Sequence, residues 1–424
     1  MNILIKSAKI IDPRNKDNGK QKDILILNGV IKEIKTNIDV SKIKAKYQLY
    51  KKPNLHISPG WFDMNVTFGE PGFEQRETLA SGTSACIKGG YTGVQIMPNT
   101  EPKLDNKSQI DFILKSTKNS VLDILPSGNI TKGGQGNEIV EMHDMSISGC
   151  KSFTDDKKSI HRNDVMKIAM LYSNDTKSLI MHYPNDPELS YGGMINEGGV
   201  STELGLTGIP NIAEKIMTQR DVELCKYTGS KLHLSYLSCK ESIEIVRKAK
   251  RKNNITCGVV VYNIFLNDSE VRNFDTRYKL LPPLRGKKDV NSIIKGLKDN
   301  TIDVITCNHM PCEEEIKKLE FDQAEFGIIG LEYSFGLIIK NVGKYLGLDS
   351  VIEKISINPR NILDIDKAEI KLDNKANITL FDPDKEWILK NSDIKSKSKN
   401  TPFLNQKLKG KPLAIYNNGK FEEC

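Results

Sequence analysis

The segment TGVQIMPNTEPKLDNKSQIDFILKSTKNSVLDILPSGN, residues 92–129, decides the fold. It begins with a strand-like run, 92–99, and ends with another, 121–129; both runs finish in polar residues. The stretch between them, 108–119, is helix-like. Strand, helix and strand in this order predict two parallel strands joined by a crossover helix.

The same alternation continues through the centre of the chain. Eight strand-like runs occur there, and most are followed by a helix-like stretch: WFDMNVT (61–67), TGVQIMPN (92–99), VLDILPSGN (121–129), CKSFTDD (150–156), SLIMHYPN (178–185), KLHLSYLS (231–238), ITCGVVVYN (255–263) and DVITCNHMP (303–311). Eight such units predict an α/β fold with a closed (β/α)8 barrel. A doubly wound open sheet is the alternative, but no Gly-rich phosphate loop follows any of the strands.

The two chain ends have a different character. ILIKSAKIID and DILILNGVIKEI near the N-terminus alternate apolar and polar residues, and so do KANITLFDPDKEWIL and PLAIYNNGKF near the C-terminus. This alternation is typical of antiparallel strands. We therefore expect residues 1–55 and 370–424 to form one accessory β-sandwich domain, with the barrel at 56–369.

Composition narrows the class of protein. Of the 424 residues, 38% are hydrophobic and 27% are charged, and no apolar run reaches the roughly 18 residues that a membrane span needs. The N-terminus lacks a signal-peptide pattern, and the 8 cysteines have no disulfide spacing, which favours a reduced cytoplasmic protein. The net charge of +8 is spread along a Lys-rich chain, so we expect neither a nucleic-acid nor a membrane partner.

Polar side chains end each of the eight runs. They are Asn65 with Thr67, Asn99, Asn129, Asp155, His182, His233, Asn263, and Asn308 with His309. In (β/α)8 barrels the C-terminal strand ends line the active-site mouth. Singly, each residue also has an ordinary interpretation as a helix cap or a hydrogen-bonded core residue. Eight together favour a mouth-lining role.

The ordered motifs resemble those of the dihydroorotase family of cyclic amidohydrolases. They are SPGWFDMNVTFGEPG, GGYTGVQIMPNT, NEGGVSTELGLTGIPNIAE, HLSYLSCKESIEIVRKAK, YKLLPPLRG, AEFGIIGLE, INPRNIL and NTPFLNQKLKGK. The resemblance covers nearly the full length. It implies a (β/α)8 barrel with a β-sandwich from both chain ends, and hydrolysis or closure of a cyclic amide in pyrimidine synthesis.

The resemblance also implies a metal site. In this family one or two Zn²⁺ ions activate a water and polarise the amide carbonyl, held by a first-strand His pair, a bridging acid and two later His. An Asp at the last strand transfers the proton. Here the His pair falls on Asn65 and Thr67, the substrate-clamping Arg falls on Gly69, and the Asp falls on Asn308. No residue is therefore assigned as catalytic.

Part of the family's site is retained. The possible metal ligands are Asp155, with Asp156 beside it, His182 and His233. These ligands would hold one zinc ion at most, and a chain without metal is equally compatible with them. The retained substrate-binding positions are Asn99, Phe326 and Gly327, whereas Leu281 and Cys312 replace two others. Cys307 and His309 flank Asn308 and should face away from the mouth.

Three functions follow from this pattern. The first is a non-catalytic, dihydroorotase-like scaffold protein, with weak or no hydrolase activity, as a partner of aspartate carbamoyltransferase. The second is an active dihydroorotase or related cyclic-amide hydrolase with a mononuclear or rebuilt metal site. The third is a binding protein for a pyrimidine-like ligand. The resemblance also allows a homodimer.

Overall fold

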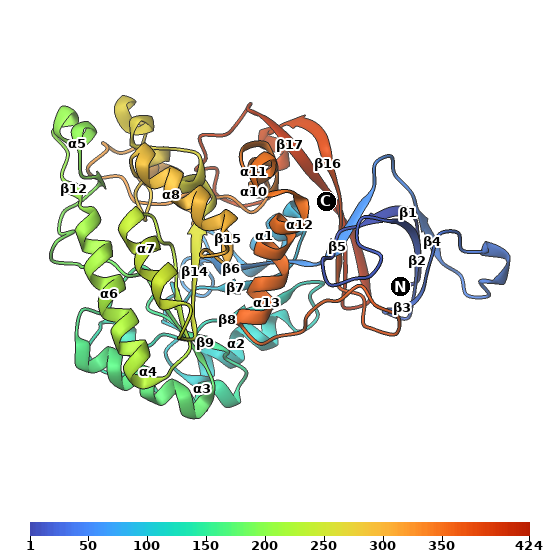
Figure 1. The fold of residues 1–424 in the computed structure, drawn as a ribbon, viewed down its shortest axis with the longest axis horizontal. Helices are drawn as coiled ribbons and strands as arrows, with labels where there is room; N and C mark the ends of the chain where they lie inside the picture. The colour runs from blue at the N-terminus through green and yellow to red at the C-terminus, as the bar shows by residue number, and fades with distance from the viewer.

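The computed structural model describes residues 1–424. Its centre is a barrel of eight parallel strands, each at one of the predicted runs: β6 (Trp61–Val66), β7 (Tyr91–Ile96), β8 (Asp123–Pro126), β9 (Ser152–Phe153), β10 (Leu179–His182), β13 (Leu232–Leu234), β14 (Ile255–Val260) and β15 (Val304–Thr306). Figure 1 shows the strands surrounded by helices. The prediction of a (β/α)8 barrel is confirmed.

The barrel closes through two short contacts between its sheets. Strands β6, β7 and β8 form one ladder, and β9, β10, β13, β14 and β15 form the other. Gly128 pairs with Phe153 beyond β8, and Val66 pairs with His309 beyond β15. Asp63 reinforces the second contact, because its carboxylate accepts hydrogen bonds from the Cys307 amide at 2.7 Å and from the Thr306 hydroxyl.

Helices follow the strands along the chain. They are α1 (Leu79–Gly89), α2 (Lys107–Thr117), α3 (Met142–Ile147), α4 (Asn163–Thr176), α5 (Gly199–Leu204), α6 (Asn211–Thr228), α7 (Lys240–Ala249), α8 (Lys287–Lys298), α9 (Glu314–Lys317), α10 (Ser334–Asn341), α11 (Gly343–Leu346), α12 (Leu348–Ile352) and α13 (Asn358–Ile362). Local sequence sets their ends. The Thr78 side chain caps α1 through the Ser81 amide, and Gly90 ends it with φ 81°.

The two chain ends build one accessory sheet beside the barrel (Figure 1). Its strands are β1 (Ile3–Ile10), β2 (Gln21–Leu27), β3 (Val30–Lys35), β4 (Gln48–Tyr50), β5 (His56–Pro59), β16 (Ile378–Ile388), β17 (Lys407–Asn417) and β18 (Lys420–Glu423). The order is β18-β17-β16-β5-β1-β2-β3, with β4 beside β1. Strand β5 joins the two ends, because it pairs with β1 and with β16. The accessory sheet is therefore built from both chain ends, and β5 belongs to it although residue 56 was expected to begin the barrel.

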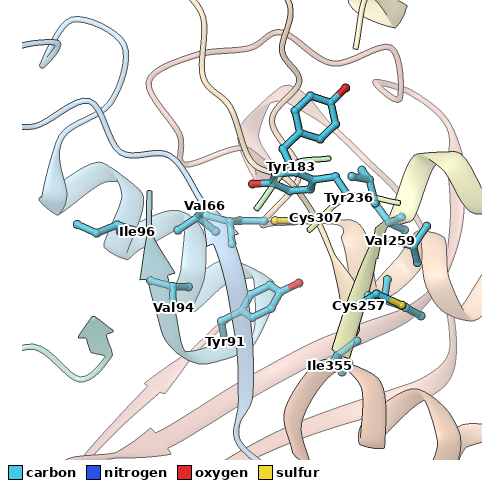
Figure 2. Packing of buried hydrophobic residues seen from close by; sticks show 14 of the residues in the cluster. Val66, Tyr91, Val94, Ile96, Tyr183, Tyr236, Cys257, Val259, Cys307 and Ile355 are labelled. Atoms are coloured by element: carbon cyan, nitrogen blue, oxygen red, sulfur yellow. The ribbon is translucent and has the colours of Figure 1, made fainter. Parts of the chain in front are cut away.

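The hydrophobic core has layers that fix which way the strand residues point. Phe62, Met64, Leu179, Met181 and Val304 form one buried cluster. They come from β6, β10 and β15, which are not all neighbours in the sheet, so the cluster lies inside the barrel. Alternate residues join a larger cluster with the surrounding helices, part of which Figure 2 shows. This alternation decides whether a side chain at a strand end can reach the mouth.

Two further findings concern the class of protein. No helix combines the length and apolar character needed to cross a membrane. All eight cysteines are free, and only Cys424 is not buried.

Candidate functional site

A pocket of about 270 Å³ opens at the C-terminal ends of the barrel strands. Its lining residues come from the loops after β6, β7, β9 and β15: Thr67, Gly69, Phe73, Arg76, Asn99, Lys103, Asp156, Lys157, Lys158, Met310 and Pro311. We call this pocket the mouth pocket. The position agrees with the general location of active sites in (β/α)8 barrels. Four of the lining side chains are cationic and one is a carboxylate.

Asp155, the expected bridging acid, does not line the mouth pocket. Its carboxylate is buried and accepts hydrogen bonds from the Ile130 and Thr131 amides, at 2.9 and 3.1 Å, and from the Asn129 amide group at 3.1 Å. Burial raises the pKa of Asp155, although these donors act in the opposite direction. The carboxylate therefore anchors the loop after β8.

Asp156, rather than Asp155, lines the mouth pocket. Its φ is 50°, a left-handed conformation, and it follows directly on Asp155. Asp156 accepts hydrogen bonds from the Asn99 amide group and, at 2.9 Å, from the Tyr236 hydroxyl. Lys157 lies 3.3 Å from the same carboxylate. Three side chains thus surround a single buried negative charge.

His182 points out of the barrel. In β10 it alternates with Met181, which belongs to the interior cluster, so its ring faces the helices. Its Nδ1 lies 2.6 Å from the Asp221 carboxylate on α6, and its Nε2 accepts a hydrogen bond from the Ile160 amide at 3.0 Å. An amide is only a donor, so the ring lone pair at Nε2 is already used.

His233 points the opposite way from His182. It pairs with Met181 in the parallel ladder, which places the two side chains on the same, interior face. Its Nδ1 lies 2.9 Å from the Thr256 hydroxyl, and its Nε2 is buried without a partner. Burial, helped by the charge of Lys250, lowers the pKa of His233 to about 3. The imidazole is therefore neutral at physiological pH.

Tyr236 fills the space between the site residues. It follows β13 with φ 59° and is 1% exposed. Besides its bond to Asp156, the hydroxyl is close enough to the Asn65 side chain for that group to lower its pKa, although burial raises the pKa overall. The Tyr183 ring packs edge-on against it at 6.1 Å, as the two neighbouring rings in Figure 2 show. The buried Tyr236 ring thus occupies space at the barrel mouth.

Asn65, Thr67 and Asn308, at which the resemblance implies lost metal-site groups, make ordinary structural contacts. Asn65 is buried, and its amide group lies 3.6 Å from the Met97 sulfur. Thr67 lines the mouth pocket, and its backbone amide bonds to the His309 carbonyl at 2.8 Å. The Asn308 side chain donates to the Leu281 carbonyl at 3.0 Å. None of the three offers a charged or titratable group to the pocket.

Of the three expected substrate-binding residues, one lies in the mouth pocket and two do not. Asn99 lies in the pocket, where its amide group is committed to Asp156. Phe326 and Gly327 are not among the lining residues; the Gly327 amide bonds to the Lys279 carbonyl, and the Lys279 ammonium lies 5.2 Å from the Phe326 ring centre. Cys312 also contacts this segment, through the Phe326 carbonyl at 3.3 Å.

The retained residues do not fit a zinc ion. Asp155 is bonded to a loop, His182 faces α6, and only His233 keeps a free ring nitrogen inside the barrel. Throughout the chain, no three His, Cys, Asp or Glu side chains gather into a group that could hold a metal ion. Zinc sites use at least three protein ligands, so one nitrogen does not suffice.

Sequence reasoning missed the residues that now define the pocket. Tyr236, Lys103, Lys157 and Lys158 drew no attention, although the run TDDKK (154–158) places two lysines directly after a strand end. That run was the available signal. For Tyr236 no local signal exists, because its role depends on a left-handed turn after β13.

Another cavity, of about 700 Å³, lies away from the mouth, between β8 and the accessory sheet. Arg360, Asn377 and Asn417 line it, and their polar groups are bonded to the surrounding chain, for example Asn417 to the Val121 carbonyl at 2.9 Å. The two carboxylates that line it, Asp123 and Asp366, accept hydrogen bonds from neutral donors, and no His, Cys or Ser lines it, so we place the candidate site at the mouth pocket.

Comparisons with known proteins define the class. The fold matches L-hydantoinase (dihydropyrimidinase) from Arthrobacter aurescens with a TM-score of 0.84 at 17% identity, covering 99% of this chain and 95% of that one. D-hydantoinase (dihydropyrimidinase) from Thermus sp. gives 0.81 at 19% identity, covering 99% and 94%. The chain thus shares the overall fold of these two solved structures.

Sequence comparison is more specific. The family model described as Dihydro-orotase-like matches residues 55–242. The dihydroorotase of Trichlorobacter lovleyi is 37% identical over 423 residues, 99% of either chain, and that of Thermoanaerobacter sp. is 39% identical over 415 residues, 97% of this chain and 94% of the other. This protein belongs to the dihydroorotase family.

Proposed function

We propose that this chain is a dihydroorotase-like protein of pyrimidine biosynthesis that has lost zinc-dependent hydrolysis and serves as a structural partner of aspartate carbamoyltransferase. One observation carries the proposal: Asp155, His182 and His233 point in three directions, and two of them have their lone pairs bonded within the fold. The family's two-metal mechanism needs these groups to converge.

The proton-transfer chemistry is missing as well. Asn308 stands at the position of the family's general base, and an amide has no titratable proton in the physiological range. Losing an acid-base group costs about 100- to 10,000-fold in rate. In addition, Gly69 stands where the family has an Arg, so a bidentate contact to a substrate carboxylate is missing.

The intact scaffold supports the structural half of the proposal. The barrel closes through Asp63, and the buried Arg285 of the PPLRG segment bonds to the Ile209 carbonyl and the Asn196 side chain. These buried polar contacts stabilise the barrel without any metal, so the fold is available to present a surface to a partner.

The first experiment measures metal and turnover on the same sample. Purified protein is assayed for carbamoyl aspartate cyclisation and dihydroorotate hydrolysis, with zinc content determined by elemental analysis. We expect less than stoichiometric zinc and no turnover above the uncatalysed rate. A dihydroorotase with the complete His-x-His motif is the positive control. Zinc-dependent turnover that disappears in His182→Ala would overturn the proposal and favour a rebuilt mononuclear enzyme.

The second experiment tests the partner. The chain is mixed with the aspartate carbamoyltransferase of the same organism and examined by size-exclusion chromatography with light scattering. We expect a complex whose mass exceeds that of either component. A homodimer of this chain alone would appear in the same measurement. Two unchanged elution profiles at micromolar concentrations would reject the scaffold role.

A further inference from the structure

Two buried lysines hold the segment 321–327 through its backbone. Lys317, at the end of α9, is 6% exposed, and its ammonium donates to the Glu325 carbonyl at 2.8 Å. Lys279 is 3% exposed and donates to two carbonyls of the same segment, at 2.6 and 3.1 Å. Neither ammonium forms an ion pair with a carboxylate, so both side chains are held by neutral acceptors alone.

Burial favours the neutral form of the Lys317 amine. It lowers the pKa of this group to about 8, and the charge of Lys279 acts in the same direction. Asp275, Glu325 and an ionised Cys312 oppose the shift without cancelling it. The Cys312 thiol is neutral at physiological pH, because burial raises its pKa to about 11. Much of Lys317 is thus an uncharged amine near pH 8, where an ordinary lysine with a pKa of about 10.4 is almost fully charged.

Lys317 also lines a cavity of about 480 Å³ beside α9, separate from the mouth pocket. The charged residues in the lining are four cations and two carboxylates: Arg277, Lys317, Lys318 and Lys399, with Asp275 and Glu314. Arg277 lies 2.6 Å from Asp275, and Lys318 lies 2.7 Å from Glu314, so both carboxylates are already paired. The lining therefore carries an excess of positive charge, which favours an anionic reactant.

We propose that Lys317 is an acylation site that takes its acyl group from a small acyl phosphate. The lone pair of Nζ attacks the acyl carbon, the bond from that carbon to the phosphate oxygen breaks, and phosphate leaves with the electron pair and one amine proton. The products are an amide at Nζ and inorganic phosphate, so no oxidant or further reactant is needed. A desolvated lysine beside another cationic group is one form of activated nucleophile.

The size of the cavity limits the donor. Its volume corresponds to roughly sixteen water molecules in the liquid, which admits an acyl phosphate. Acyl thioesters share the acyl-transfer chemistry, but a carrier built on a nucleotide is too large to enter whole. The cavity therefore favours the phosphate as the source of the acyl group.

Acylation would act close to the mouth pocket. Glu325, whose carbonyl accepts the bond from Lys317, pairs through its carboxylate with Arg76 of the mouth pocket at 3.1 Å. An amide at Nζ keeps one N–H donor and loses the positive charge, so the bond to the segment 321–327 becomes an uncharged one. The inference does not depend on whether the mouth holds zinc, and its test can fail while the proposed function stands.

Acetyl phosphate tests the site on the folded chain at pH 8. Digestion after glutamate releases the peptide IKKLE (316–320), so tandem mass spectrometry compares Lys317 with its neighbour Lys318 in one fragment. Lys318 is the matched control, because it is exposed and its hydrogen bond to Glu314 raises its pKa. We expect Lys317 to be acetylated at least about tenfold faster, and the ratio to shrink above about pH 10, where both amines lose their protons. Equal rates at pH 8, or a faster reaction at Lys318, would overturn the proposal.

Three controls locate the reactivity. In urea-unfolded protein the two lysines should react equally, and a preference for Lys317 that persisted there would reject the role of the cavity. Lys317→Arg keeps the positive charge and removes the amine nucleophile, so acetylation of the peptide should fall to the Lys318 level; circular dichroism checks that this variant folds. Acetyl-CoA at the same concentration is the second donor. A faster reaction of Lys317 with acetyl-CoA than with acetyl phosphate would reject the phosphate as the source.

Discussion

Single side chains decide whether this barrel mouth can hold a metal. Asp155 and Asp156 are neighbours in the sequence, yet the left-handed conformation of Asp156 sends one carboxylate to a loop and the other into the pocket. His182 and His233 likewise point to opposite faces of the sheet. The presence of an Asp or a His at an expected position therefore does not mean that its side chain reaches the site.

Tyr236 offers a test of the closed mouth. Tyr236→Phe removes the hydroxyl that bonds to Asp156 and leaves a buried carboxylate oxygen without this donor. We expect the free energy of unfolding to fall by about 1 to 3 kcal/mol, measured by urea denaturation. In the double variant with Asp156→Ala the two effects should not add fully, because both substitutions remove the same hydrogen bond. Full additivity would contradict the contact.

His233 predicts a pH dependence of stability. Its pKa is about 3 in the folded chain and about 6.5 when unfolded, so the unfolded state binds the extra proton as pH falls below 6.5. Stability present at pH 7 is then lost on acidification, by about 2 kcal/mol at pH 5. His233→Gln should flatten this part of the urea-denaturation profile. His143→Gln, at an exposed position, is the control and should leave the slope unchanged.

At the scale of elements, the Asp63 carboxylate on β6 bonds to the end of β15 where the barrel closes. Both oxygens of Asp63 act as acceptors: one for the Asn65 amide at 2.9 Å and the Thr306 hydroxyl, the other for the Cys307 amide. Burial raises the pKa of Asp63, and these donors oppose that effect. Strand β6 is thus held in place by its first polar residue, Asp63.

Asp63→Asn tests this closure. Asparagine supplies one acceptor oxygen, and its NH2 group would face another donor. We expect a loss of about 2 to 4 kcal/mol in the free energy of unfolding, measured by urea denaturation. Asp111→Asn on α2 removes only an exposed contact of 3.8 Å to Lys115 and should change stability by less than about 0.5 kcal/mol. Equal effects of the two variants would reject the closing role.

The elements themselves were largely predictable. The helix-like stretch 108–119 corresponds to α2, because apolar spacing and helix caps are local signals. Side-chain direction at the strand ends was not predictable. It depends on positive φ angles at Asp156, Tyr236 and Asn308, which no pattern in the chain announces.

For the whole molecule, removal of metal should change nothing. Dialysis against EDTA is expected to shift the melting temperature by less than about 1 °C, because no group of three ligands contributes binding energy to the fold. A tightly bound ion at 1,000 times its dissociation constant would contribute about 4 kcal/mol, and its loss would appear as a shift of several degrees. Such a shift, reversed by added zinc, would contradict the structure.

The sequence by itself determined the strand-helix alternation and the barrel with a sheet from both chain ends. It also placed Asn65, Thr67 and Gly69 where the family resemblance implies imidazole and guanidinium groups. These depend on local periodicity and on residue identity. Tertiary structure alone decided that His182 turns to Asp221, that Asp155 ties down a loop, and that Lys103 and Asp156 line one pocket. The physical reason is that each of these contacts joins separate segments, so direction and distance exist only after the barrel has closed.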